Sequence, residues 1–130
     1  EHGYAALLAA GLERGALMGG GTGVFLGIAA ADWYDIVKAS PMSRSVYAAT
    51  GSSRSIAAGR ISFVLGLQGP CVSYDTACSA ALAANHAALR ALQMEECPDA
   101  LLLAVSMMLL PGLEMSFAIA GMTSATGSCK

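Results

Sequence analysis

Charge is the property that this sequence lacks most. Charged residues make up 12% of its 130 residues and hydrophobic residues 55%, and this charged share is about half that of an ordinary soluble domain. The seven Lys and Arg residues are scattered along the chain and form no basic cluster. A nucleic-acid-binding surface requires such a cluster, so we expect no nucleic acid partner.

The shortage of charge also bears on how complete the domain is. A chain of this composition has too little polar surface to cover itself. It begins at Glu1 without an initiator Met and ends at Lys130 without a polar tail. We therefore expect residues 1–130 to be an interior part of a larger domain.

Long hydrophobic runs are absent as well. The most apolar run, residues 100–110, has about half of the ~20 residues that a membrane-spanning helix needs. We expect a buried strand there and no membrane span. No basic segment followed by an apolar stretch marks a signal peptide. This pattern predicts a cytoplasmic protein, or an organellar one if a targeting segment precedes Glu1.

Metal-ligand and cofactor motifs are also missing. The cysteines at positions 71, 78, 97 and 129 show no C-x-x-C or Cys/His spacing, so we expect neither a metal site nor a disulfide. The glycines of residues 19–23 do not complete G-x-G-x-x-G, because Val24 and Leu26 stand where glycine is required. We therefore expect no cofactor bound by this chain. No G-x-S-x-G motif occurs, which disfavours an acyl hydrolase.

What the chain does contain is an alternation of helix and strand signals. Strand patterns occupy residues 24–28, 71–74 and 100–107, and helical patterns occupy residues 1–17, 53–66, 78–93 and 113–120. Residues 30–45 are typical of a partly helical surface connection. This alternation indicates an α/β fold with a mostly parallel sheet covered by helices. The many alanines of residues 78–93 predict a buried helix that its neighbours approach closely.

Cys78 is the one residue whose position favours nucleophilic chemistry. It stands where the short strand of residues 71–74 passes into the alanine-rich helix. The N-terminus of a helix offers unpaired N–H groups and a positive dipole end, both of which favour a thiolate. Asp75 and Thr76 are residue types that shape such a corner through hydrogen bonds to the backbone.

The surrounding residues resemble a known family. The run from Gly59 to Pro70 (GRISFVLGLQGP) and the run from Asp75 to Ser79 (DTACS) are similar to the active-site region of β-ketoacyl synthases, in particular the ketosynthase domains of modular, type I-like polyketide synthases. Further segments resemble that family along essentially the whole chain: residues 23–27 (GVFLG), 47–51 (YAATG), 120–122 (AGM) and 129–130 (CK).

The resemblance implies a thiolase-like fold of two similar halves, with residues 1–130 inside the first half and the second half absent. It implies that Cys78 accepts an acyl group from the phosphopantetheine thioester of an acyl carrier protein. A malonyl-type extender is then decarboxylated, and its carbanion attacks the acyl-cysteine to give a β-ketoacyl thioester. The resemblance further implies that the backbone N–H of Cys78 contributes to an oxyanion hole. The resemblance also implies a homodimer that pairs through residues 71–74.

The histidines of the chain do not supply the remaining catalytic groups. In the family, two histidines and a lysine downstream of the cysteine act on the extender, and this chain does not reach them. His2 matches no catalytic motif, and His86 lies eight residues after Cys78, roughly 12 Å along a helix. Lys130 resembles the lysine that ends the glycine-methionine loop of the family. We therefore expect the chain alone to be inactive in condensation.

Two alternatives stay open at this point. A fatty-acid-type ketosynthase shares the cysteine corner and uses a narrower set of acyl chains. An inactive thiolase-fold scaffold or chain-length partner typically lacks the nucleophile, and the presence of Cys78 disfavours it. Residues 79–81 (SAA) and 104–108 (AVSMM) depart from the usual family pattern, which leaves the branch and the preferred acyl chain undetermined.

Overall fold

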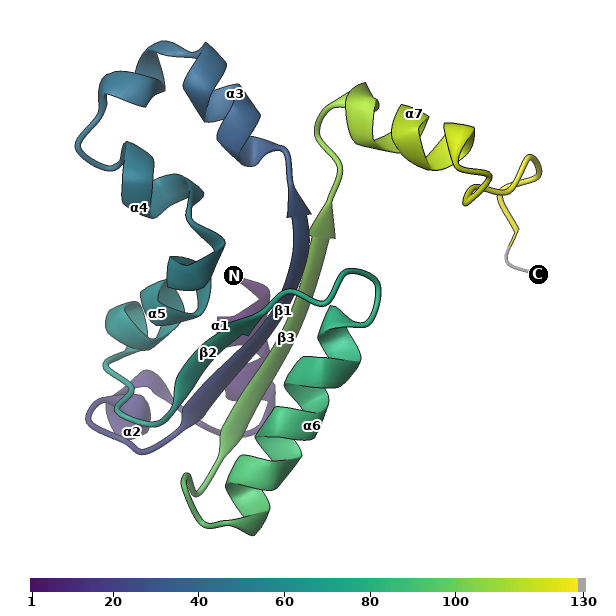
Figure 1. Cartoon of the computed structure of the whole chain (residues 1–130). Coiled ribbons are helices and arrows are strands. Elements are labelled where there is room, and N and C mark those ends of the chain that lie inside the picture. The colour runs from purple at the N-terminus through teal and green to yellow at the C-terminus, as the bar shows by residue number, and fades with distance from the viewer. Residues whose placement is uncertain (129–130) are drawn as a thin grey trace.

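A parallel three-stranded sheet forms the centre of the molecule in the computed structural model, which describes residues 1–128 (Figure 1). Strand β1 (Gly23–Ala31) lies between β2 (Cys71–Tyr74) and β3 (Ala100–Met107), and both pairings are parallel. The predicted α/β class and its parallel sheet are confirmed. The Cys129–Lys130 segment of the resemblance lies outside the described residues.

The side chains of β1 alternate between two hydrophobic clusters. Val24 and Leu26 point to one face of the sheet and Phe25 to the other, and each is at most 3% exposed. Successive residues of a strand point to opposite faces, and a central parallel strand is covered on both. This explains why its sequence is continuously apolar rather than alternating.

Three helices cover the first face: α1 (His2–Ala9), α2 (Arg14–Leu17) and α5 (Arg54–Leu65). Helix α5 begins after Ser53 and ends at Gly66, whose φ of 69° is left-handed. Both ends agree with the prediction, since glycine adopts this conformation at a helix end without steric cost. Together with the strands, these helices enclose one cluster of buried side chains: Leu7, Leu17, Val24, Leu26, Ala58, Leu65, Leu67 and Leu101.

Helix α6 (Ala80–Gln93) covers the second face of the sheet. Its alanines at positions 84, 88 and 91 are at most 4% exposed and pack with Phe25 and Cys97. The predicted burial of the alanine-rich helix is confirmed for this face. The opposite face carries Leu82 and Leu89, which are 72% and 50% exposed.

The start of α6 differs from the sequence prediction. The helix begins at Ala80, with Ser79 as its N-cap, and Cys78 lies in the turn before it. Ala77 has a φ of +53°, and this left-handed backbone cannot belong to a right-handed helix. The helix therefore begins two residues later than the predicted start at Cys78.

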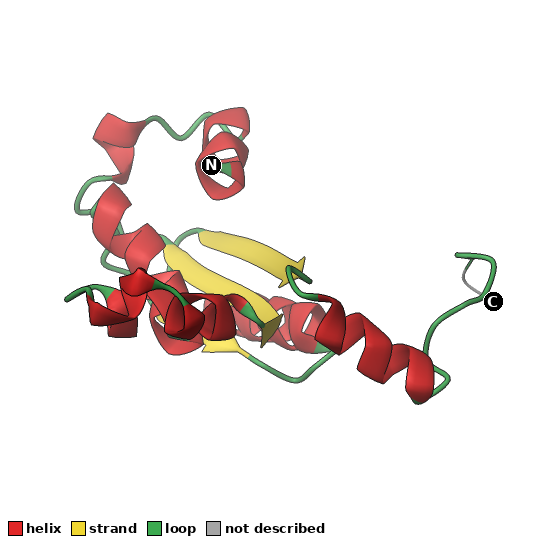
Figure 2. Cartoon of the chain, turned by 90° about the horizontal axis from the view of Figure 1, so that it is seen from above, coloured by secondary structure: helices red, strands yellow, loops and turns green. Residues whose placement is uncertain are grey.

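Strand β3 is more exposed than its apolar sequence predicts. Leu102, Val105 and Met107 are 40%, 42% and 55% exposed, because β3 forms an edge of the sheet. Helix α7 (Pro111–Ile119) follows it and extends away from the sheet (Figure 2). The predicted strand is present, but among the described residues no element covers its second half.

The connection between β1 and α5 is made of short helical pieces. It contains α3 (Trp33–Ala39), the 3-10 helix η1 (Pro41–Arg44) and α4 (Ala48–Ser52), which form an arch at one end of the sheet (Figure 1). The indole Nε1 of Trp33 donates to the Gly51 carbonyl at 3.2 Å. The predicted partly helical surface connection is confirmed. Within residues 1–128, no helix has the length and hydropathy to cross a membrane.

Candidate active site

Cys78 lies at the carboxyl end of the sheet, where ligands commonly bind to open α/β folds. It is exposed and stands in the turn of residues 75–79, hereafter the Cys78 turn, between β2 and α6. A cavity of about 540 Å³, hereafter the Cys78 cavity, opens beside it. Its lining comes from β1, β3, the Cys78 turn, the first turns of α5 and α6, and the segment from Met108 into α7: Gly27, Ala29, Arg54, Asp75, Ala77, Cys78, Ala80, Ala81, Ala104, Val105, Ser106, Met108, Leu113 and Phe117.

The Cys78 turn is held by hydrogen bonds within itself. The Ser79 hydroxyl donates to the Thr76 carbonyl at 2.8 Å, with Thr76 Oγ1 2.9 Å away. The Asp75 carboxylate accepts the Ala77 N–H at 3.3 Å. Asp75 and Thr76 thus shape the corner, as the sequence predicts. Ala77, directly before Cys78, has a left-handed backbone conformation. The surrounding structure must impose this conformation on an alanine.

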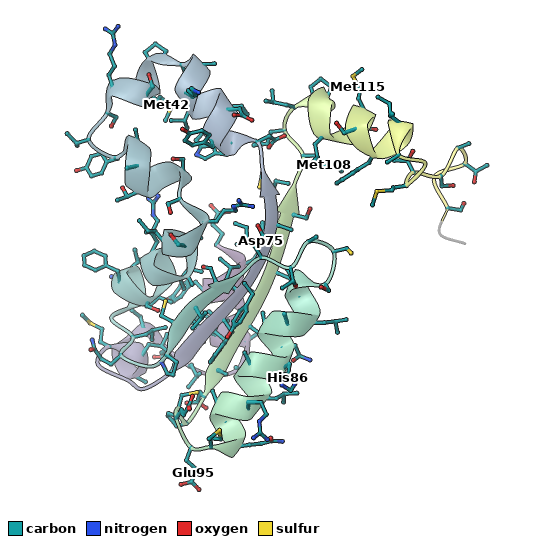
Figure 3. All side chains as sticks on the ribbon, in the orientation of Figure 1. Met42, Asp75, His86, Glu95, Met108 and Met115 are labelled. Atoms are coloured by element: carbon teal, nitrogen blue, oxygen red, sulfur yellow. The ribbon has the colours of Figure 1, made fainter. Side chains whose placement is uncertain are left out.

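A second carboxylate oxygen of Asp75 joins the turn to α5. Asp75 Oδ2 accepts a hydrogen bond from the guanidinium of Arg54 and forms an ion pair with it. Figure 3 shows Asp75 beside the loop that leads from β2 to α6. Arg54 was not identified from the sequence, because 21 residues separate it from Asp75 and no local pattern connects the two.

Gly27 allows α6 to approach the sheet at this point. A Cβ at position 27 would lie 2.7 Å from the carbonyl carbon and oxygen of Ala80, well inside the normal contact distance. Ala80 itself is 4% exposed. The missing side chain of Gly27 therefore lets the first turn of α6, and the adjoining Cys78 turn, lie against β1.

Three large apolar side chains contribute to the lining of the Cys78 cavity. They are Met108, at the end of β3, and Leu113 and Phe117, on α7. Figure 3 shows Met108 at the junction between β3 and α7. The sequence did not indicate that these residues share a cavity with Cys78, because their grouping depends on how β3 pairs with β1.

The histidines lie outside the Cys78 cavity. His2 and His86 are both exposed, and neither contributes to the cavity lining. Figure 3 shows His86 well down α6 from Asp75. The distance along the helix thus keeps His86 from Cys78, as the sequence predicts.

The other described cysteines have different environments. Cys71 is exposed on β2, and Cys97 is buried under α6. Both are free thiols, like Cys78. Across residues 1–128, no three His, Cys, Asp or Glu side chains gather in a way that would hold a metal ion.

Comparison with known proteins agrees with this geometry. The family described as "Beta-ketoacyl synthase, N-terminal domain" matches residues 1–130. The chain is 38% identical over all of its length to polyketide synthase GfsB of Streptomyces halstedii and to erythronolide synthase EryA3 of Saccharopolyspora erythraea. It spans 2% and 4% of those two proteins.

A solved structure shows the same fold. The ketosynthase from module 6 of the bacillaene synthase of Bacillus subtilis 168 superposes with a TM-score of 0.81 at 36% identity. The superposition covers 98% of this chain and 21% of that ketosynthase, and it confirms the predicted thiolase-like fold. The relatives named here are modular polyketide synthases and one of their ketosynthases, and the chain belongs to the β-ketoacyl synthase family.

Proposed function

We propose that this chain is the nucleophile-bearing part of a polyketide ketosynthase and that Cys78 is its acyl-accepting residue. One observation carries the proposal: in a chain of this family, an exposed cysteine stands before a helix N-terminus and lines a cavity at the carboxyl end of the sheet. A cysteine nucleophile requires access to substrate and an environment that favours the thiolate. Cys71 and Cys97 line no part of that cavity.

The first step is acyl transfer. The Cys78 thiolate attacks the carbonyl carbon of an acyl thioester, and the C–S bond to the carrier thiol breaks after the tetrahedral intermediate forms. The carrier thiolate leaves and takes up a proton. The developing oxyanion is stabilised by the backbone N–H of Cys78 and by the dipole of the 14-residue helix α6.

The second step is condensation. A malonyl-type thioester loses carbon dioxide, and the resulting carbanion attacks the carbonyl of acyl-Cys78. The new carbon–carbon bond gives a β-ketoacyl thioester, and the Cys78 thiolate is released. This step needs two histidines and a lysine that the family supplies elsewhere, so the isolated chain does not condense. The chain spans about a fifth of the solved ketosynthase, which supports a place for residues 1–130 inside the N-terminal half of a longer domain.

The partner that fits this chemistry is an acyl carrier protein. Its phosphopantetheine arm delivers both thioesters, and the chain itself binds no cofactor. Nucleic acid is not a partner, because the seven Lys and Arg residues form no basic cluster. We place the reaction in the cytoplasm, or in an organelle if a targeting segment exists, and the free thiols of Cys71, Cys78 and Cys97 suit a reducing compartment.

A homodimer through β2 is part of the proposal. Strand β2 lies at an edge of the sheet, and Cys71 and Val72 are exposed. An unpaired strand edge presents N–H and C=O groups that a second strand satisfies. Pairing of two β2 strands, residues 71–74, would extend the sheet across both subunits. Sedimentation of the complete domain as a monomer would contradict this arrangement.

The alternatives are less well supported. The relatives described above are polyketide synthases, which favours polyketide over fatty-acid synthesis. An inactive scaffold does not need the exposed Cys78 and its cavity.

Intact-mass measurement of the complete ketosynthase domain tests the proposal. After incubation with an acyl-pantetheine thioester, we expect one acyl adduct on the wild-type protein and none on Cys78→Ala. Cys71→Ser is the matched control, because Cys71 is also an exposed thiol, and it should acquire the adduct. An adduct on Cys78→Ala would show that the nucleophile assignment is wrong.

A further inference from the structure

Arg54 and Asp75 connect the two faces of the sheet beside Cys78. Arg54 is the first residue of α5, which packs on one face, and Asp75 follows β2 on the path to α6, which packs on the other. Their ion pair and hydrogen bond therefore join the start of α5 to the Cys78 turn. Both residues also line the Cys78 cavity.

The Asp75 carboxylate has two separate functions in this arrangement. One oxygen accepts from Arg54, and the other accepts from the N–H of Ala77 at 3.3 Å. Ala77 has the left-handed φ of +53° and precedes Cys78 directly. An alanine adopts this conformation at a steric cost, so the backbone direction into Cys78 depends on what holds the Ala77 amide.

Global stability does not account for the pair. The side chains of Arg54 and Asp75 are 47% and 41% exposed, and ion pairs at such exposure contribute little to folding. It is the one salt bridge found within residues 1–128, in a chain with few charged residues. The pair lies in the wall of the Cys78 cavity and not on a remote helix face. Its role is therefore to hold the local geometry of the Cys78 turn.

We infer that Arg54 is a positioning residue for Cys78 and acts through Asp75. Arg54 fixes the Asp75 carboxylate, the carboxylate holds the Ala77 N–H, and the turn then presents the Cys78 thiol and backbone N–H to the cavity. This inference rests on the proposed acyl transfer to Cys78. Misplacement of a nucleophile by an ångström costs up to about a hundredfold in rate, so partial loosening of an exposed turn should cost about tenfold.

Single-turnover acylation of the complete domain tests the inference. Arg54→Met and Asp75→Asn should each lower the rate constant for Cys78 acylation at saturating acyl-pantetheine thioester by about tenfold. The half-saturating thioester concentration and the melting temperature should stay near those of the wild type. Arg54→Lys should recover part of the rate, since it retains the positive charge.

A double variant separates a shared role from two independent ones. If Arg54 acts through Asp75, Arg54→Met combined with Asp75→Asn should be no slower than the slower single variant. The matched controls are Arg90→Met, on the far end of α6, and Asp35→Asn, on α3; both residues are exposed and outside the Cys78 cavity. Wild-type rates in the Arg54 and Asp75 variants, or multiplied losses in the double variant, would overturn the inference.

A second measurement keeps the inference independent of the proposed function. If the wild-type domain forms no acyl adduct, the acyl-transfer proposal fails, and hydrogen exchange at the amides of residues 75–79 still reports on the turn. We expect faster exchange at the Ala77 amide in both variants and unchanged exchange in the two controls. Unchanged exchange in Arg54→Met and Asp75→Asn would overturn the positioning role by itself.

Discussion

Gly27 of β1 and Ala80 of α6 meet backbone to backbone. A Cβ added at Gly27 would lie 2.7 Å from the Ala80 carbonyl carbon and oxygen, and backbone atoms of a sheet and a helix have little freedom to withdraw. The contact sets how closely the start of α6 approaches the sheet. Because Cys78 lies two residues before Ala80, the same contact limits how far the Cys78 turn stands from β1.

Gly27→Ala should therefore displace the Cys78 turn. We expect a loss of about 1–3 kcal/mol in the free energy of unfolding, as for other overpacked positions, together with slower acylation of Cys78. Urea denaturation and single-turnover acylation of the complete domain measure the two effects. Gly15→Ala is the control, because a Cβ there meets nothing within 4 Å. Equal stability of the two variants would show that α6 can shift without cost.

Asp32 fixes the loop that leads into α7. Its Oδ2 accepts the N–H groups of Leu109 and Leu110, both at 2.7 Å. Asp32→Ala should leave both donors without their charged acceptor and lower the free energy of unfolding by about 1–3 kcal/mol. Hydrogen exchange at these two amides should become faster. Asp35→Ala, an exposed change on the adjoining helix α3, should leave that exchange unaltered; equal effects of the two changes would contradict this role for Asp32.

Phe117 occupies part of the wall of the Cys78 cavity. It lines the Cys78 cavity from α7, so Phe117→Ala should enlarge the cavity and favour bulkier acyl thioesters. We expect the ratio of kcat/KM for a branched over an acetyl thioester to rise by about tenfold or more, the discrimination that one methylene group gives in an apolar pocket. Met115→Ala is the control, since Met115 is 61% exposed on the same helix and outside the cavity. An unchanged ratio in Phe117→Ala would show that Phe117 does not contact the acyl group.

His86 should be dispensable for acyl transfer. It is exposed on α6 and does not line the Cys78 cavity. His86→Gln should retain the wild-type acylation rate of Cys78 at every pH between 6 and 9, roughly the range that spans ordinary histidine and cysteine titration. A fall of tenfold or more, measured by intact mass in single turnover, would make His86 part of the catalytic apparatus.

Features determined by adjacent residues were predictable from the sequence. Helix α5 ends at Gly66, whose left-handed φ suits glycine, and starts after Ser53, which is the N-cap residue although its side chain makes no capping hydrogen bond. The same holds for the strand of residues 71–74 and for the turn-forming function of Asp75. The start of α6 was placed two residues too early, since the left-handed φ of Ala77 has no signal in an alanine.

The sequence by itself therefore determined the order of elements, the parallel α/β class and the position of Cys78 between a strand and a helix, because these follow from local periodicity and turn chemistry. Only the tertiary structure decided that Arg54 pairs with Asp75, that Gly27 lies against the backbone of Ala80, and that Met108 and Phe117 line the same cavity as Cys78. Each of these contacts joins residues more than ten positions apart. Their formation depends on the strand order β2-β1-β3, which brings distant segments together at one end of the sheet.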